Sequence, residues 1–259
     1  MTEKLEPMGQ TAAVRAAAWV LLVAPLIQLL AMAHHPSVHA HEVTEVVSEL
    51  RASAGQSALV HGILIALMYL VLLALTEFSV RRGLARPAVR AALIAYGAGV
   101  LLVTTAALVS GFITPAIALA VPAVAPADAA LITQFATFAS LFNQAFARCA
   151  EVLICAGIAL WSLELLRGSV AARAIAVFGL LTGLGCALAL VSGVLQLRVH
   201  GMAAVLALQS LWTIGVGALL LREARTGGAS FARAACGESG GRCTEDAPVD
   251  TNILAEYDD

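Results

Sequence analysis

The chain has 259 residues, of which 60% are hydrophobic and 12% are charged, and its mean hydropathy is +0.89. Soluble proteins carry about 25% charged residues, so this composition excludes a soluble globular domain and predicts a membrane protein. Only Lys4 among the fifteen cationic residues is a lysine, and the formal net charge is −2, which leaves no basic surface for nucleic acid. The abundance of Ala and Leu and the scarcity of Lys indicate GC-rich codon usage, so we expect a bacterial inner-membrane protein.

Six segments are long and apolar enough to span a bilayer as helices, since one span takes about 20 apolar residues. The loops between them are short, which predicts an all-α fold, a polytopic six-helix transmembrane bundle forming one domain over residues 1–222. After Arg222 the chain turns to Gly, Ser and acidic residues, and residues 223–259 are predicted to form a disordered cytoplasmic tail. The predicted spans are residues 13–33, 58–80, 91–115, 136–163, 174–197 and 202–221.

The cationic residues predict the orientation of the bundle, because short cytoplasmic loops are enriched in Lys and Arg. Arg51 and Arg198 lie on one side of the predicted membrane, and Arg148 falls within a span. Both termini are therefore predicted to be cytoplasmic, and the loop after the first span is predicted to be periplasmic. The other twelve of the fifteen cationic residues lie on the side of the termini: Lys4, Arg15, Arg81, Arg82, Arg86, Arg90, Arg167, Arg173, Arg222, Arg225, Arg233 and Arg242.

The first span runs into AMAHHPSVHAHE, residues 31–42, where four of the six histidines of the chain follow the apolar run. Its AMA triplet, residues 31–33, also fits the pattern before a signal-peptidase site, and cleavage there would leave His34 as the N-terminus. Glu3 and Glu6 lie in a long segment before the apolar run, which is not typical of a signal peptide. We therefore favour an uncleaved transmembrane helix.

The histidines indicate a transition-metal site, because neutral imidazole is a common ligand of copper and zinc. His61 is predicted at the outer end of the second span, and His200 in the turn between the last two spans, so all six histidines fall on the periplasmic face. Their spacing matches no motif of fixed geometry, and an interfacial segment that binds metal only adventitiously is the alternative. The candidate ligands of a Cu or Zn ion are His34, His35, His39, His41, His61 and His200.

The stretch EVTEVVSELR, residues 42–51, predicts a short amphipathic helix. Val43, Val46, Val47 and Leu50 recur at helical spacing, and the glutamates gather on another face. We expect this helix to lie along the outer membrane surface and to cap the bundle.

The fourth span combines a polar stripe with an aromatic one at helical periodicity. Intramembrane charges normally face the interior of a bundle, so the polar stripe is predicted to point inward. Arg148 and Glu151 are three residues apart and are expected to pair across one turn. They either fix helix packing, or Glu151 binds a proton or a metal ion beneath an outer vestibule. The candidate intramembrane polar network is Gln144, Arg148, Glu151 and Cys155.

The aromatic stripe occupies the opposite face of the same span and contains half of the eight phenylalanines. It is predicted to face lipid, a membrane-protein partner or a second copy of the chain. Its members are Phe135, Phe138, Phe142 and Phe146.

Three functions follow from these patterns. The first is binding or handling of a Cu or Zn ion at the periplasmic face, and the second is a structural or assembly subunit of a larger membrane complex. The third is a membrane redox protein in which His61 and His200 ligate one haem. The chain has no phosphate-binding motif and no large extramembrane domain, so we expect neither ATP-driven transport nor an enzyme, and no catalytic residue is predicted.

Overall fold

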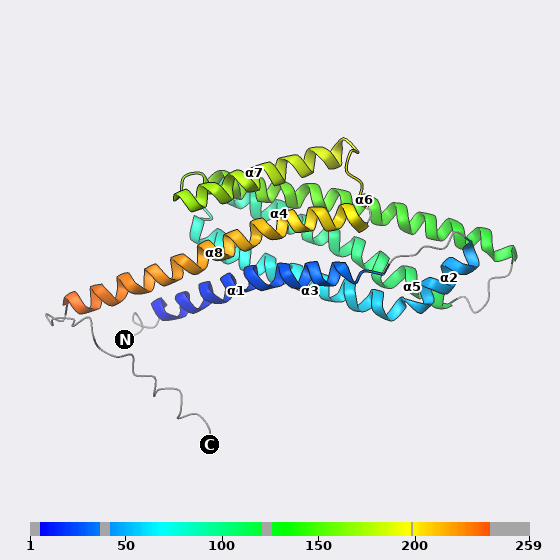
Figure 1. Ribbon diagram of the computed structural model, residues 1–259, viewed down its shortest axis with the longest axis horizontal. Coiled ribbons are helices and arrows are strands. Elements are labelled where there is room, and N and C mark those ends of the chain that lie inside the picture. Colours follow the sequence, from blue (N-terminus) through cyan, green and yellow to red (C-terminus); the bar gives the residue numbers. More distant parts are fainter. Residues whose placement is uncertain (1–5, 37–41, 121–125, 198, 239–259) are drawn as a thin grey trace, which may run out of the picture.

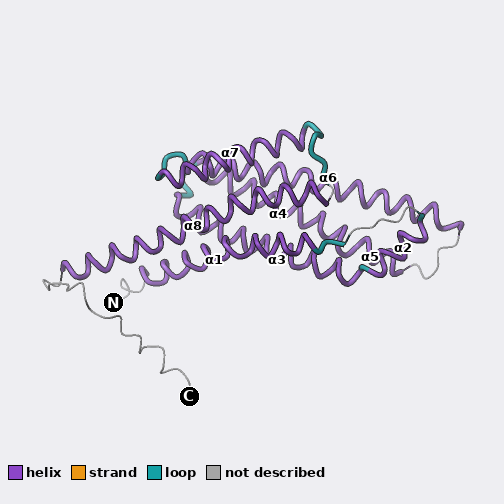
Figure 2. Tube along the Cα trace, in the orientation of Figure 1, coloured by secondary structure: helices purple, strands orange, loops and turns teal. Residues whose placement is uncertain are grey.

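The computed structural model describes residues 6–36, 42–120, 126–197 and 199–238, and every regular element within these ranges is a helix (Figures 1 and 2). Six of the helices are long and apolar enough to cross a membrane, which confirms the predicted all-α polytopic bundle. The elements are α1 (Glu6–Ala33), α2 (Val43–Ala52), α3 (Ala54–Arg82), α4 (Pro87–Leu108), the π-helical turn η1 (Val109–Ile113), α5 (Thr114–Ala120), α6 (Pro126–Leu165), α7 (Val170–Val191) and α8 (Val199–Glu238).

Two helices extend well beyond the predicted spans. With 40 residues, α6 is about 60 Å long, twice the hydrocarbon thickness of about 30 Å. It therefore projects past its neighbours together with α2 and α5 (Figure 1). At the opposite end, α8 continues through the predicted boundary at residue 222 to Glu238, so the first part of the predicted tail is helical. Residues 239–259 lie outside the described ranges.

The six long helices form a closed ring in the order α1, α3, α4, α6, α7 and α8, and α8 packs back against α1. Glycine allows some of the closest contacts in this ring. A Cβ atom at Gly183 of α7 would lie 2.6 Å from the Cys155 carbonyl oxygen of α6. A Cβ atom at Gly217 of α8 would lie 3.0 Å from the Ala18 carbonyl oxygen of α1. Because α1 closes the ring, cleavage after residue 33 would remove one of its walls.

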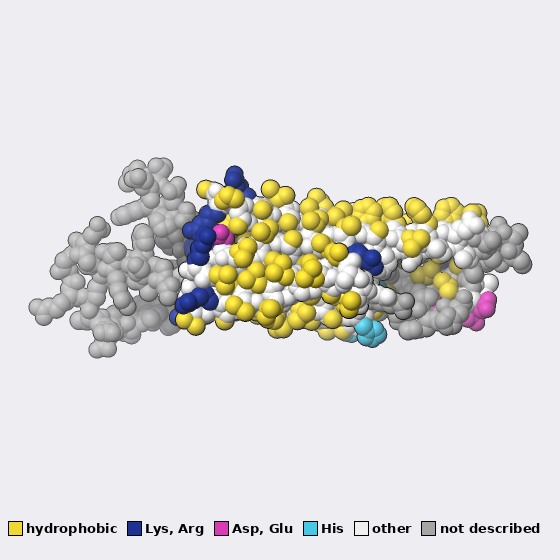
Figure 3. All heavy atoms as spheres, turned by 90° about the horizontal axis from the view of Figure 1, so that it is seen from above, with side chains coloured by type: hydrophobic (Ala, Val, Ile, Leu, Met, Phe, Trp, Pro, Cys, Tyr) yellow, Lys and Arg dark blue, Asp and Glu magenta, His cyan; other side chains and the backbone are white. Residues whose placement is uncertain are grey.

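The two ends of the ring differ in charge. Arginines gather at the end where α1 begins and α8 leaves the ring (Figure 3), and we call this the arginine end. Ion pairs join helices there: Arg82 Nη2 lies 2.6 Å from Glu223 Oε1, and Arg86 Nη1 lies 2.8 Å from Glu164 Oε2. The opposite end of the ring carries His34, and we call it the histidine end.

Next to the arginine end, the interior of the ring is filled by Phe78, Tyr96, Trp161 and Trp212, which we call the aromatic plug. The rings of Trp161 and Trp212 are stacked with centroids 6.0 Å apart, and both residues are fully buried. Each indole N–H has a partner, Trp161 Nε1 donating to Ser79 Oγ and Trp212 Nε1 to Ser162 Oγ, both at 3.0 Å. The plug therefore closes one half of the ring with satisfied hydrogen bonds.

The predicted amphipathic helix is α2. Val47 is buried and Glu45 is exposed, as the periodicity predicts. Arg51 Nε at the end of α2 donates a hydrogen bond of 2.6 Å to the Ala118 carbonyl oxygen of α5. This bond ties α2 to the part of the molecule that projects beyond the histidine end (Figure 1).

Candidate functional site

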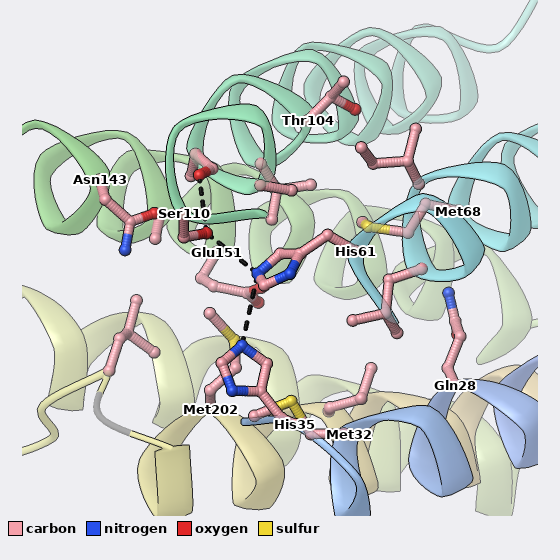
Figure 4. Close-up of a pocket in the computed structure, with 18 of the residues that line it drawn as sticks. Gln28, Met32, His35, His61, Met68, Thr104, Ser110, Asn143, Glu151 and Met202 are labelled. Atoms are coloured by element: carbon pink, nitrogen blue, oxygen red, sulfur yellow. Dashed lines mark hydrogen bonds between the residues drawn. The ribbon is translucent and has the colours of Figure 1, made fainter. Parts of the chain in front are cut away.

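The ring of helices encloses a cavity on the histidine side of the aromatic plug. The cavity has a volume of about 390 Å³ and lies between α1, α3, α4, η1, α6 and α8. Most of its wall is apolar, with Leu64, Ile65, Val103 and Leu206 among the lining residues. Polar side chains from α1, α3, α4, η1, α6 and α8, and from His35 just after α1, line it. Figure 4 shows seven of them, Gln28, His35, His61, Thr104, Ser110, Asn143 and Glu151, and Gln144 and Gln209 line it as well.

Two of the six candidate histidines meet in this cavity. His35 follows the end of α1 and His61 lies in the second turn of α3, and their Nε2 atoms are 3.3 Å apart. The two rings meet edge to face, with centroids 4.9 Å apart. Burial lowers the pKa of His35 from its ordinary value, so its ring is neutral at pH 7. Two ring nitrogens from residues 26 positions apart in the sequence therefore lie next to each other in the cavity.

The local structure around His61 defines its ring orientation. Nδ1 lies 2.8 Å from the Ser57 carbonyl oxygen one turn earlier in α3. A carbonyl can only accept, so Nδ1 carries the proton and Nε2 presents a lone pair. Nε2 lies 3.0 Å from Ser110 Oγ. This tautomer is the one found in metal-binding histidines whose second nitrogen is held by a carbonyl group.

The π-helical turn η1 makes room for the His61 ring. A Cβ atom on Gly111, in the middle of this turn, would lie 2.5 Å from Cβ and Cγ of His61. A larger residue at this position therefore cannot be accommodated without moving the histidine. The extra residue of a π-turn also shifts the helix register, and here Ser110 Oγ comes within hydrogen-bond distance of His61. Single π-turns are frequent at functional sites.

Thioether groups lie close to the two histidines. The three methionines whose side chains the structure describes, Met32, Met68 and Met202, all line the cavity. Figure 4 shows Met32 and Met202 beside the His35 ring, and Met68 further along α3. Imidazole and thioether groups from α1, α3 and α8 thus share one cavity.

The four residues of the polar network predicted on the fourth span do not all come together in the structure. Glu151 is 5% exposed and lines the cavity, and Gln209 of α8 donates a hydrogen bond of 2.7 Å to its Oε2. Gln209 Nε2 also lies 3.6 Å from the buried Cys155 Sγ. Gln144 lines the outer part of the cavity and donates to the Leu197 carbonyl oxygen.

Arg148 lies apart from this group. It is exposed, and none of the ion pairs among the described residues includes Arg148 or Glu151. At 100° per residue Arg148 is about 60° away from Glu151 around the helix, and its long side chain can remain outside the ring. The expected pairing across one turn is therefore replaced by a hydrogen bond across helices.

The other candidate histidines are not brought into the cavity. His34 is exposed, with Nδ1 2.9 Å from the Leu30 carbonyl oxygen, and His200 is exposed at the start of α8. His39 and His41 lie outside the described residues. The partner of His61 in the structure is thus His35, whereas the haem hypothesis pairs it with His200.

The phenylalanine stripe of α6 faces away from the ring at its outer end. Phe135 is 51% and Phe138 is 66% exposed, whereas Phe142 and Phe146 are partly buried. Consecutive rings are in contact, with centroids 5.9 Å apart for Phe138 and Phe142 and 4.4 Å apart for Phe142 and Phe146. The exposed part therefore offers an apolar surface, and a partner for it stays a prediction.

Within the described ranges, no group of three or more His, Cys, Asp and Glu side chains is arranged to hold a metal ion. A site built on His35 and His61 therefore needs other ligand types. The methionines, Ser110, Gln209 and the π-turn were not singled out from the sequence. A signal for the methionines is present, since Met32 and Met202 lie close in sequence to His34, His35 and His200.

The fold and the cavity together define a polytopic α-helical membrane protein with a polar, histidine-containing cavity inside its bundle. The chain matches none of the protein families, curated proteins or solved structures with which it was compared. The chemistry of the cavity is therefore what indicates its function.

Proposed function

We propose that this protein binds a Cu(I) ion in the cavity, with His35 and His61 as imidazole ligands and Met32 and Met202 as thioether ligands. The distance of 3.3 Å between the two Nε2 atoms is the observation that supports this most strongly. Ligand nitrogens about 2.0–2.1 Å from a tetrahedral ion are separated by about 3.3 Å. A small ion can therefore take the place of the proton between the rings with little movement of either, once that proton has moved to Nδ1 of His35.

The accompanying side chains favour Cu(I) over Zn(II). Thioether sulfur is a soft ligand that selects Cu(I), whereas Zn(II) sites are completed by thiolate, imidazole or carboxylate. Met32 and Met202 line the cavity from two different helices. The hydrogen bond from His61 Nδ1 to the Ser57 carbonyl supplies the outer-shell support expected for a ligating imidazole.

We also propose an orientation of the bundle in the membrane. The arginine end would face the cytoplasm, because short cytoplasmic loops are enriched in cations, and the histidine end would face the periplasm of a bacterial inner membrane. An ion would then enter the cavity from outside and stop at the aromatic plug. We therefore propose binding and handling of the ion at the periplasmic face.

The test is a Cu(I) competition titration of full-length protein, purified in detergent under reducing conditions, against a chromogenic Cu(I) chelator. We expect one ion per chain, and at least 100-fold weaker binding for the double variant H35A/H61A. The matched control is H34A/H200A, which removes two exposed histidines and leaves the affinity unchanged. Equal affinities of wild type and H35A/H61A, or no Cu(I) bound by wild type, would refute the proposal.

The assembly-subunit hypothesis has one specific observation in its favour. The outer part of α6 exposes Phe138 and Leu141 to 66% and 67%, on a helix that projects beyond the ring (Figure 1). Native mass spectrometry of protein extracted in mild detergent tests it. A stoichiometric complex lost in the F138E variant would favour this second function.

A further inference from the structure

The cavity is much larger than a metal site. A volume of about 390 Å³ lies in the range of pockets that hold small organic molecules, about 300–1,000 Å³. A four-coordinate ion occupies only the space between its ligands. Leu64, Ile65 and Val103 line further parts of the cavity, so its dimensions and apolar wall fit a compact organic guest.

One acidic group faces this space. Glu151 is 5% exposed and lines the cavity, and Figure 4 shows its side chain directed into it. An ionised carboxylate accepts about four hydrogen bonds. Gln209 supplies one of them, at 2.7 Å. The remaining acceptor capacity of Glu151 is available to a guest.

A buried carboxylate is costly unless a cation or several donors compensate its charge. No ion pair among the described residues includes Glu151. Arg148, three residues earlier on α6, is exposed, and the arginines of the ion pairs lie at the other end of the ring. Among the described residues, the carboxyl group of Glu151 therefore has a hydrogen-bond partner but no cationic partner.

We propose that the cavity binds a small organic cation, in which an ammonium group pairs with Glu151 and an apolar body packs against the wall formed by α3, α4 and α8. This inference goes beyond the Cu(I) site and uses none of its four ligands. The guest would enter from the histidine end, because the aromatic plug closes the other half of the ring. Gln209 holds the carboxylate in place for the ammonium group.

The experiment compares two probes of nearly the same shape, phenethylamine and 2-phenylethanol, by equilibrium dialysis against metal-free full-length protein in detergent. At pH 7 the amine is protonated, since alkylamines have a pKa near 10. We expect the amine to bind at least tenfold more tightly than the alcohol. Equal binding of the two probes, or no binding of the amine, would overturn the proposal without any variant.

Variants locate the charge responsible. E151Q is expected to abolish the preference for the amine, and the control E77Q, which changes a carboxylate at the arginine end, to retain it. Retention of the preference in folded E151Q would contradict the role of Glu151. H35A/H61A is expected to lose Cu(I) and to keep the amine, so failure of the metal site and failure of the organic-cation site give different results.

Discussion

The two halves of the ring interior lie within the same helix bundle and have opposite character. In the arginine half, Trp161 and Trp212 are fully buried, stacked and hydrogen bonded through their indole nitrogens. In the histidine half, a cavity of about 390 Å³ contains a histidine pair and a buried carboxylate. One half is packed like a protein core, and the other leaves volume and hydrogen-bonding capacity unused.

The difference shows how stability and binding are separated along one bundle. Large aromatic side chains bring dispersion contacts and buried area, which hold the helices together. An unfilled cavity does the reverse, because the side chains around it forgo contacts that a filled core would make. The bundle can keep such a cavity because the plug and the ion pairs at the arginine end stabilise the other half.

The largest expected effect comes from emptying the plug. Trp212→Ala should lower the free energy of unfolding by about 3–5 kcal/mol, the usual cost of truncating a buried tryptophan. Trp19→Ala is the matched control, since Trp19 is 56% exposed on α1, and it should change stability by about 0.5 kcal/mol or less. Thermal and denaturant unfolding in detergent measures both. Equal losses would show that the plug is no better packed than the outer surface.

A smaller effect is expected from changing the site where His61 packs. Gly111→Ala would place a Cβ atom 2.5 Å from Cβ and Cγ of His61 and displace its ring. We expect Cu(I) affinity to fall about 10- to 100-fold, as when a metal ligand loses its outer-shell support. The control is Gly185→Ala, whose Cβ would meet nothing within 4 Å. Chelator competition on the folded fraction checks this, and an unchanged affinity in Gly111→Ala would contradict the assigned site.

The affinity for Cu(I) should depend only weakly on pH near neutrality and more strongly at acidic pH. A metal ion and a proton compete for the same imidazole nitrogen. Burial lowers the pKa of His35, below the ordinary histidine value of about 6.5, so the ring is already neutral at pH 7. Affinity should therefore change little from pH 8 to 7 and fall at more acidic pH, by up to about tenfold per pH unit for each imidazole that takes up a proton. A steep fall between pH 8 and 7 would mean that a different group with a higher pKa binds the ion.

The smallest effect is expected at Arg148. Because Arg148 is exposed and Glu151 is held by Gln209, Arg148→Ala should change the free energy of unfolding by about 0.5 kcal/mol or less. Were the two residues a buried ion pair, removal of the arginine would cost about 3–5 kcal/mol. Unfolding in detergent therefore distinguishes the arrangement seen in the structure from the pairing that the sequence favoured.

Much of the candidate site was beyond prediction from the sequence. The histidines and Glu151 stood out, because polar residues beside or within apolar spans are rare. Their partners did not, since His35 and His61 are 26 residues apart and Gln209 is 58 residues from Glu151. Helical periodicity relates residues within one helix, whereas these contacts depend on which helices are neighbours and how each is rotated.

The sequence by itself determined that this is a six-helix membrane protein with a short amphipathic helix after the first span. The reason is that lipid leaves backbone groups no partner outside the chain, so a long apolar segment must be helical. Only the tertiary structure decided which polar groups meet. Spans of similar hydropathy pack through small residues such as Gly111 and Gly183, whose contacts depend on three-dimensional fit, and that fit brought His61 to His35 and Gln209 to Glu151.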